Sequence, residues 1–141
     1  MDKQEIEKKL KDGWIHSLML IHILAITKEA AESALKKHVD ALHKENRTLV
    51  ARKTFLETKL VVKPHPDIPE GYSQVAEVEL LTADLDSLMY VVMNYAPSSI
   101  EILAPKKLTV DIGEAQGILT SVAALIHRFA AMGIGGVVVR S

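Results

Sequence analysis

The stretch that decides the fold runs from residue 72 to residue 104. It begins Tyr72-Ser-Gln-Val-Ala-Glu-Val-Glu-Leu-Leu81 and continues Thr82-Ala-Asp-Leu-Asp-Ser-Leu88. Apolar and acidic residues alternate over 77–80, which predicts a strand with one buried face and one solvated face. The continuation places a cap residue and two acids before an apolar stripe, which predicts the start of a helix.

The carboxyl-terminal half continues to alternate between strand and helix signals. The expected elements are a strand over 72–81, a helix over 82–96, strands over 99–104 and 108–110, a helix over 111–131 and a strand over 137–139. Thr82 and Asp111 are the expected N-caps, because their side-chain oxygens can accept from free amides of the first turn. Pro97 and Pro105 should bracket a strand, since proline restricts the residue before it.

Strand, helix, strand, strand, helix, strand is the order of a ferredoxin-like βαββαβ sandwich, with both helices on one face of an antiparallel sheet. We therefore expect an α+β fold of this type over 72–141. A strand over 50–63 would extend the edge of the sheet. The run 63–71 contains three prolines and predicts a loop.

The amino-terminal part predicts helices. A charged lead from Met1 to Lys11 ends near Gly13, and 14–26 is apolar nearly all round, which we interpret as a buried or interfacial helix. Thr27 should cap an amphipathic helix over 28–44. Its apolar stripe is Ala31, Leu35, His38, Val39 and Leu42. We expect one domain over 1–141, with a helical part over 1–47 and an α+β sandwich over 48–141.

Composition excludes several classes of protein. The chain has 141 residues, of which 48% are apolar and 25% charged, and it contains no cysteine. These values exclude a disordered tail, a disulfide scaffold and thiolate metal sites. The start of the chain is no signal peptide, and the apolar run 14–26 falls short of the roughly 20 residues that cross a membrane. We expect a cytoplasmic protein without a membrane partner.

Charge is segregated along the chain. Residues 28–63 carry nine basic and five acidic residues, whereas 64–105 carry seven acidic residues and no Lys or Arg. Each segment can have its own solvated face, or the basic part of one subunit can meet the acidic part of another. Acids lie among the basic residues, and no sheet face combines basic with aromatic residues, which argues against a nucleic-acid partner.

The run Val78–Leu88, followed by Asn94–Leu108, resembles part of the carboxyl-terminal extension of bacterial WYL-domain transcription regulators. There too an alternating strand leads into an acid-capped helix, a short turn and a further strand. The resemblance covers 72–130 and implies a ferredoxin-like module for regulation and oligomer assembly, with small ligands between subunits. No winged helix or WYL core precedes it. The chain also resembles an archaeal protein family without assigned activity.

Four residues are candidates for catalysis. His65 stands first among them for acid–base work, because two prolines place it in a loop near an acid. Tyr72, Glu101 and His127 could join it at an oligomer interface. No pair of histidines has the i,i+4 spacing of a zinc helix, so we expect no metal and no cofactor. The glycines of 133–136 follow a helix, which favours a turn over a phosphate loop.

Two hypotheses follow from the sequence. The first is a non-catalytic regulatory or assembly module that senses a small ligand at a subunit interface. The second is a small oligomeric enzyme whose active site forms at that interface. Both predict a homo-oligomer, and we expect the apolar segment 14–26 to contribute to the contact.

Overall fold

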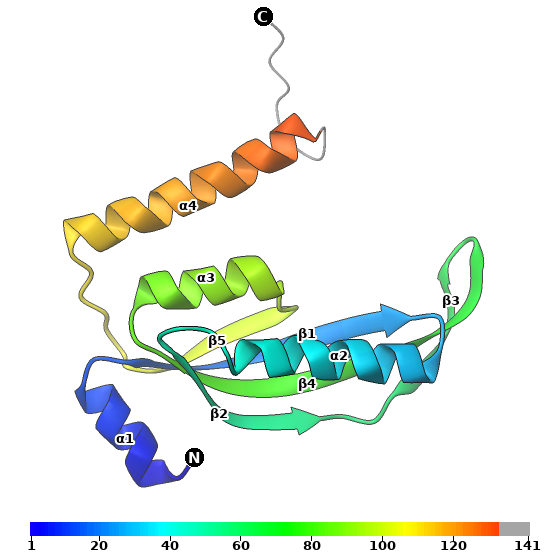
Figure 1. The fold of residues 1–141 in the computed structure, drawn as a ribbon, viewed down its shortest axis with the longest axis horizontal. Helices are drawn as coiled ribbons and strands as arrows, with labels where there is room; N and C mark the ends of the chain where they lie inside the picture. The colour runs from blue at the N-terminus through cyan, green and yellow to red at the C-terminus, as the bar shows by residue number, and fades with distance from the viewer. Residues whose placement is uncertain (133–141) are drawn as a thin grey trace, which may run out of the picture. The chain divides into compact units, whose positions relative to one another are not determined.

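The computed structural model describes residues 1–132 (Figure 1). The chain divides into two compact units, Met1–Lys107 and a second that begins at Leu108. The fold is α+β, and the described part has four helices and a five-stranded antiparallel sheet. The elements are α1 (Lys3–Lys11), β1 (Ile15–Ala25), α2 (Lys28–Leu42), β2 (Thr48–Phe55), β3 (Lys59–His65), β4 (Ile68–Thr82), α3 (Leu85–Tyr95), β5 (Ser99–Ala104) and α4 (Ile112–Ala131).

The sheet has the strand order β2-β4-β1-β5. Strand β3 lies outside this order and pairs with the first residues of β4. Helix α2 connects β1 to β2, and β4 lies between these two strands. Helix α3 connects β4 to β5, and β1 lies between them. The longest register joins β1 to β4 and runs from Ile15 opposite Thr82 to Ala25 opposite Tyr72. Two interleaved β-α-β crossovers therefore build the sheet.

The ferredoxin-like sandwich expected over 72–141 is wrong. Of its expected strands, 108–110 forms no strand, and 137–139 lies outside the described residues, as does the glycine turn at 133–136. The sheet instead takes β1 and β2 from the part of the chain before residue 72.

Segment 14–26 is a strand, not the helix that its composition suggested, so the expected helical part over 1–47 contains a central strand. Along β1 the odd-numbered residues Ile15, Ser17, Met19 and Ile21 are buried, and the even-numbered ones between them are less so. Strand β1 lies between β4 and β5 in the sheet, and Leu18 and Leu20, on the face opposite the core, are also partly buried. Ile15, Met19 and Ile21 are buried within this chain, whereas Leu24 and Ile26 remain exposed.

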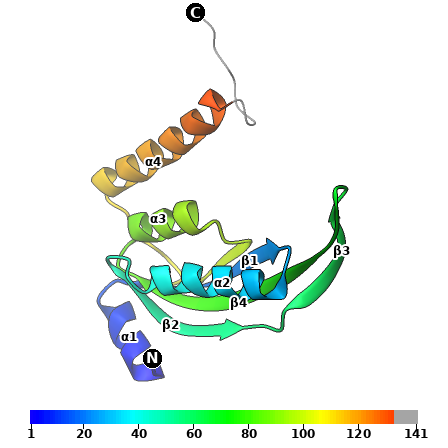
Figure 2. The same cartoon turned by 45° about the vertical axis from the view of Figure 1, so that its right-hand side comes forward.

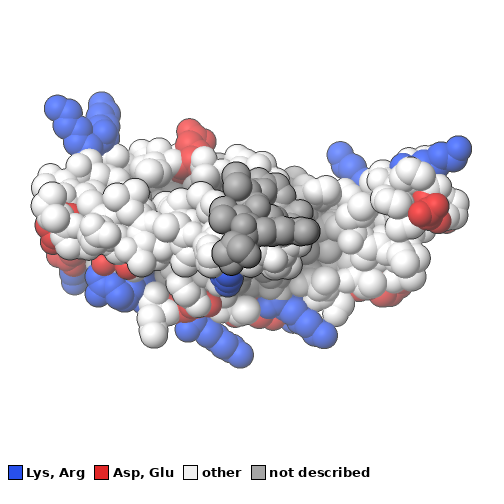
Figure 3. Space-filling model, turned by 90° about the horizontal axis from the view of Figure 1, so that it is seen from above, with Lys and Arg blue, Asp and Glu red and all other residues white. Residues whose placement is uncertain are grey.

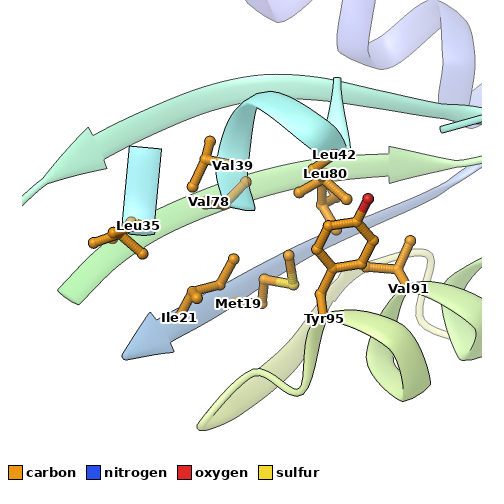
Figure 4. Packing of buried hydrophobic residues seen from close by; sticks show 10 residues of the cluster. Met19, Ile21, Leu35, Val39, Leu42, Val78, Leu80, Val91 and Tyr95 are labelled. Atoms are coloured by element: carbon orange, nitrogen blue, oxygen red, sulfur yellow. The ribbon is translucent and has the colours of Figure 1, made fainter. Parts of the chain in front are cut away.

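The core lies on one face of the sheet, where α2 and α3 cover β1 and β4. Side chains from these four elements meet in one cluster (Figure 4). Its members are Met19, Ile21, Leu35, Val39, Leu42, Ala76, Val78, Leu80, Val91 and Tyr95. Four of the five residues expected in the stripe of α2 are buried, namely Ala31, Leu35, Val39 and Leu42, whereas His38 is only half-buried.

Capping residues set most helix boundaries. Thr27 Oγ1 accepts from Ala30 N at 3.1 Å, and Asp111 Oδ1 accepts from Glu114 N at 2.8 Å, so both expected N-caps are confirmed. Thr82 is not the cap of α3: it ends β4, and Asp84 caps the helix. Helix α3 ends before Ala96, which takes the left-handed conformation (φ 45°) because the following proline disfavours the right-handed helix.

The expected strand over 50–63 is two strands, β2 and β3, separated by residues 56–58. The expected loop over 63–71 is largely a hairpin, since β3 runs to His65 and β4 starts at Ile68. Pro64 is tolerated in β3 because β3 pairs on one side only, and Pro66 lies in the turn. This hairpin extends from the end of the sheet in both ribbon views (Figure 2).

Among residues 1–132, none of the helices combines the length and the hydropathy that a membrane crossing requires.

Candidate ligand-binding site

Two turns meet at the end of the sheet where β2 begins and β4 ends. Arg47, in the α2–β2 turn, has a left-handed backbone with φ 58°. Its carbonyl oxygen accepts from Ala83 N at 2.9 Å, and its Nη2 lies 2.7 Å from Asp84 Oδ2. A non-glycine residue in this conformation is strained, so these two contacts hold Arg47 in place from the β4–α3 connection.

The carboxylate of Asp84 makes hydrogen bonds to the α2–β2 turn and to the first turn of α3. Its Oδ1 accepts from Ser87 N at 2.8 Å and caps α3, while Oδ2 receives Arg47. Burial on its own would raise the pKa of Asp84, but the hydrogen bonds from Ser87 and Arg47, with the charge of Arg47, hold that pKa below its usual value of 3.8. Asp84 is therefore a carboxylate at neutral pH, and it neutralises the arginine.

A second set of polar contacts lies between α2 and α3. The Tyr95 hydroxyl donates to Glu45 Oε1 at 2.7 Å, and His38 Nε2 lies 3.0 Å from the Tyr95 carbonyl oxygen. The rings of His38 and Tyr95 are 4.9 Å apart. Burial and the neighbouring Glu45 carboxylate raise the pKa of Tyr95 above its usual range. Tyr95 is thus a hydrogen-bond donor that fixes the Glu45 side chain.

A cavity of about 340 Å³ opens between these contacts, which we call the turn cavity. Its lining comes from the α2–β2 turn and the first two turns of α3: Glu45, Asn46, Arg47, Asp86, Ser87 and Tyr90. Arg47 is paired with Asp84, and the Glu45 carboxylate, whose partner Tyr95 is a neutral hydroxyl, adds a negative charge to the wall. The wall also offers an amide, a hydroxyl and the half-exposed ring of Tyr90.

The turn cavity is suited to binding. Its arginine and its glutamate are already hydrogen-bonded to Asp84 and Tyr95, which keeps them in fixed positions. Preorganised polar groups in a concave site give specificity for a small molecule. The negative wall favours a ligand with positive charge.

The structure places the four sequence candidates in separate parts of the fold. His65 is near the tip of the β3–β4 hairpin, exposed, with Nδ1 3.8 Å from Asp67 Oδ2. Tyr72 is half-buried in β4, between Ala25 of β1 and Leu60 of β3.

Glu101 is exposed on β5, opposite Leu18 of β1. Strand β5 pairs with the first half of β1, whereas Tyr72 pairs with its last residue, so the two candidates lie at different ends of the sheet. His127 is exposed on α4, in the second unit. Within the first unit, His65, Tyr72 and Glu101 are not brought into one site.

Sequence reasoning missed a pair on the sheet face that points away from the core. His16 Nε2 lies 3.0 Å from Glu79 Oε1, and both side chains are mostly buried. Arg52 Nε lies 3.5 Å from the other oxygen of Glu79. Residues 16 and 79 are 63 positions apart, and only the strand register brings them together. Had 14–26 been interpreted as a strand, the alternation would have placed His16 on the same face as Glu79.

Residues 1–132 contain no cluster of three or more His, Asp or Glu residues arranged to hold a metal ion.

Comparison with known proteins gives a family. The model of the MJ0538 family matches residues 16–141. None of the curated proteins matches the chain. The resemblance to WYL-domain regulators is not supported, because the matching model is of a different family. The match covers almost the whole chain, which therefore belongs to the MJ0538 family.

Proposed function

We propose that this protein is a non-catalytic regulatory module that binds a small organic cation, an amine, in the turn cavity. The observation on which the proposal rests is the ion pair between Arg47 and Asp84 at the cavity wall. Asp84 neutralises Arg47, so the carboxylate of Glu45 gives the wall a negative charge. An ammonium group is the complement of such a wall, and the ring face of Tyr90 adds a favourable surface for it.

The backbone of Arg47 supports the same proposal. Strained residues persist where the surrounding structure holds them, and they cluster at ligand sites. Arg47 is held by Ala83 and Asp84, which belong to the segment that leads into α3. A ligand that contacts the turn and α3 together would link these two elements and stabilise the fold.

Thermal unfolding in the presence of a metabolite library tests the proposal. We expect amines to raise the melting temperature and carboxylic acids of similar size to leave it unchanged. Glu45→Gln keeps an oxygen that can accept from the Tyr95 hydroxyl but removes the charge. This variant should lose most of the amine-induced shift while its own melting temperature stays close to that of the natural protein.

Glu70→Gln is the matched control, because Glu70 is an exposed acid in β4 opposite Val62, away from the cavity lining. It should respond to amines as the natural protein does. Equal loss of the response in both variants would point to general charge attraction, and a response to carboxylic acids alone would contradict the proposed ligand class.

The alternative is a small oligomeric enzyme, and one observation favours it. Glu79 orients His16 at 3.0 Å, as a carboxylate orients the imidazole of a general base. The pair lies on the sheet face opposite the core, where another subunit could supply further groups. Product formation from the same library, abolished by His16→Gln, would establish this alternative. Ligand-induced stabilisation without turnover would exclude it for the compounds tested.

A further inference from the structure

Helix α4 carries an unusual surface for a helix with no buried residue. It has 20 residues, and Glu114 and Arg128 are its only Asp, Glu, Lys or Arg. Phe129 is 44% exposed, and Met132, directly after the helix, is 67% exposed. The space-filling view marks the Lys and Arg side chains in blue and the Asp and Glu side chains in red (Figure 3). Large apolar side chains in contact with water are costly, so α4 is expected to have a partner.

The apolar residues of α4 follow a heptad repeat, which we call the α4 seam. Ala115, Val122 and Phe129 occupy the first position of the heptad, and Ile118, Leu125 and Met132 occupy the fourth. These are the two core positions of a pair of packed helices. The seam spans about 27 Å at 1.5 Å per residue, which is enough for several interlocking layers of side chains.

The two charged residues of α4 lie on one flank of the seam. Glu114 and Arg128 each directly precede a first-position residue, and so does Ser121, midway between them. This flanking position is where charges select the partner and the orientation of paired helices. The other flank carries the apolar Ile112, Leu119 and Ile126. One flank is therefore polar and the other apolar. The orientation of the two paired helices determines whether the polar flank contacts a polar or an apolar flank of its partner.

We propose that α4 pairs with α4 of a second copy of this chain in antiparallel orientation, centred on Ser121. Like flanks meet in an antiparallel pair, so Glu114 lies opposite Arg128 of the partner subunit, and the reverse contact forms at the other end. A parallel pair would place Glu114 beside the apolar flank instead. Antiparallel packing also aligns each helix dipole favourably with its neighbour. This interface is independent of the proposed ligand.

Disulfide mapping tests the geometry, and the natural chain has no cysteine to interfere. In the antiparallel pair the two copies of residue 121 face each other across the symmetry axis. We expect Ser121→Cys to give mostly covalent dimers on oxidation. Thr120→Cys is the matched control, because Thr120 is exposed on the side of α4 away from the seam. It should stay single-chain on a non-reducing gel.

Charge exchange provides a second test. Glu114→Lys and Arg128→Glu should each weaken dimerisation on the order of tenfold, since each change places like charges together at both ends. The double variant should restore it. Both changes oppose the helix dipole, so recovery in the double variant cannot come from a more stable helix.

Light scattering on the natural full chain should give twice the 15.5 kDa of one chain. A mass of 15.5 kDa at micromolar concentration would overturn the proposal. Equal cross-linking of the two cysteine variants, or none in Ser121→Cys, would also overturn it. So would a double charge variant that dimerises no better than the single ones.

Discussion

Asp84 caps α3 and pairs with Arg47 of the α2–β2 turn, and it is the residue most open to a direct test. Replacing it with alanine removes both the cap of α3 and the ion pair with Arg47. We expect Asp84→Ala to lower the free energy of unfolding by about 0.5–2 kcal/mol at neutral pH. Asp84→Asn keeps an oxygen for Ser87 N and should cost less than about 1 kcal/mol, because the ion pair is partly exposed. Urea unfolding of the two variants measures both values.

The same residue predicts a dependence on pH. The folded protein holds the pKa of Asp84 below 3.8, so the unfolded chain binds the proton more readily. The stability that the carboxylate contributes is therefore complete well above pH 3.8 and is lost as the pH falls through the lower folded value. The stability difference between the natural protein and Asp84→Asn should be constant near neutral pH and shrink in acid. A difference that grows in acid would mean that the pKa of Asp84 is raised.

At the residue scale, the sequence predicted contacts that are local. Thr27 and Asp111 were identified as N-caps because the amide that a cap accepts lies three residues further along. Thr82 was taken for the cap of α3, but its side chain is fully buried at the end of β4, and Asp84 caps the helix two residues later. Glu45 could not be placed by such reasoning, because its partner Tyr95 is 50 positions away.

At the scale of elements, β1 is the strand on which the fold depends. Buried and partly exposed residues alternate along β1, so we expect substitutions of its buried residues to destabilise the protein more than substitutions of their neighbours. Met19 is fully buried between strands and helices, whereas Leu20 points to the opposite face and is partly exposed. We expect Met19→Ala to cost about 2–5 kcal/mol, because it leaves a cavity in the core. Leu20→Ala should cost clearly less. Chemical denaturation of both variants measures the contrast, and equal costs would mean that β1 does not separate a covered face from a less covered one.

The interpretation of 14–26 as a helix failed for a physical reason. An apolar run without polar alternation has no periodicity that separates a buried strand from a buried helix. Helix α2 was predicted correctly because its apolar residues recur with helical spacing, and four of the five residues of its expected stripe are buried. The turn cavity was not predicted, since its lining joins 45–47 to 86–90 through the tertiary fold.

At the scale of the whole molecule, the segregated charges meet partly within one chain. Strand β2, from the basic segment, pairs with β4, from the acidic segment. Arg52 contacts Glu79 and Arg47 contacts Asp84 across that boundary. The basic and acidic segments thus have intramolecular partners at these points, and contact between subunits is not needed to explain them. Assembly is proposed through α4 instead of the segment 14–26.

The central claim is that the turn cavity binds a small organic cation, and amide chemical-shift mapping tests it most directly. The isotope-labelled full chain is titrated with the amine that gives the largest thermal shift. We predict that the amides of 45–47 and 86–90 move with one common saturation curve, that those near the β3–β4 hairpin tip at 65–68 do not, and that Glu45→Gln abolishes the changes. Shifts confined to other parts of the chain, or unchanged shifts in Glu45→Gln, would contradict the proposed site.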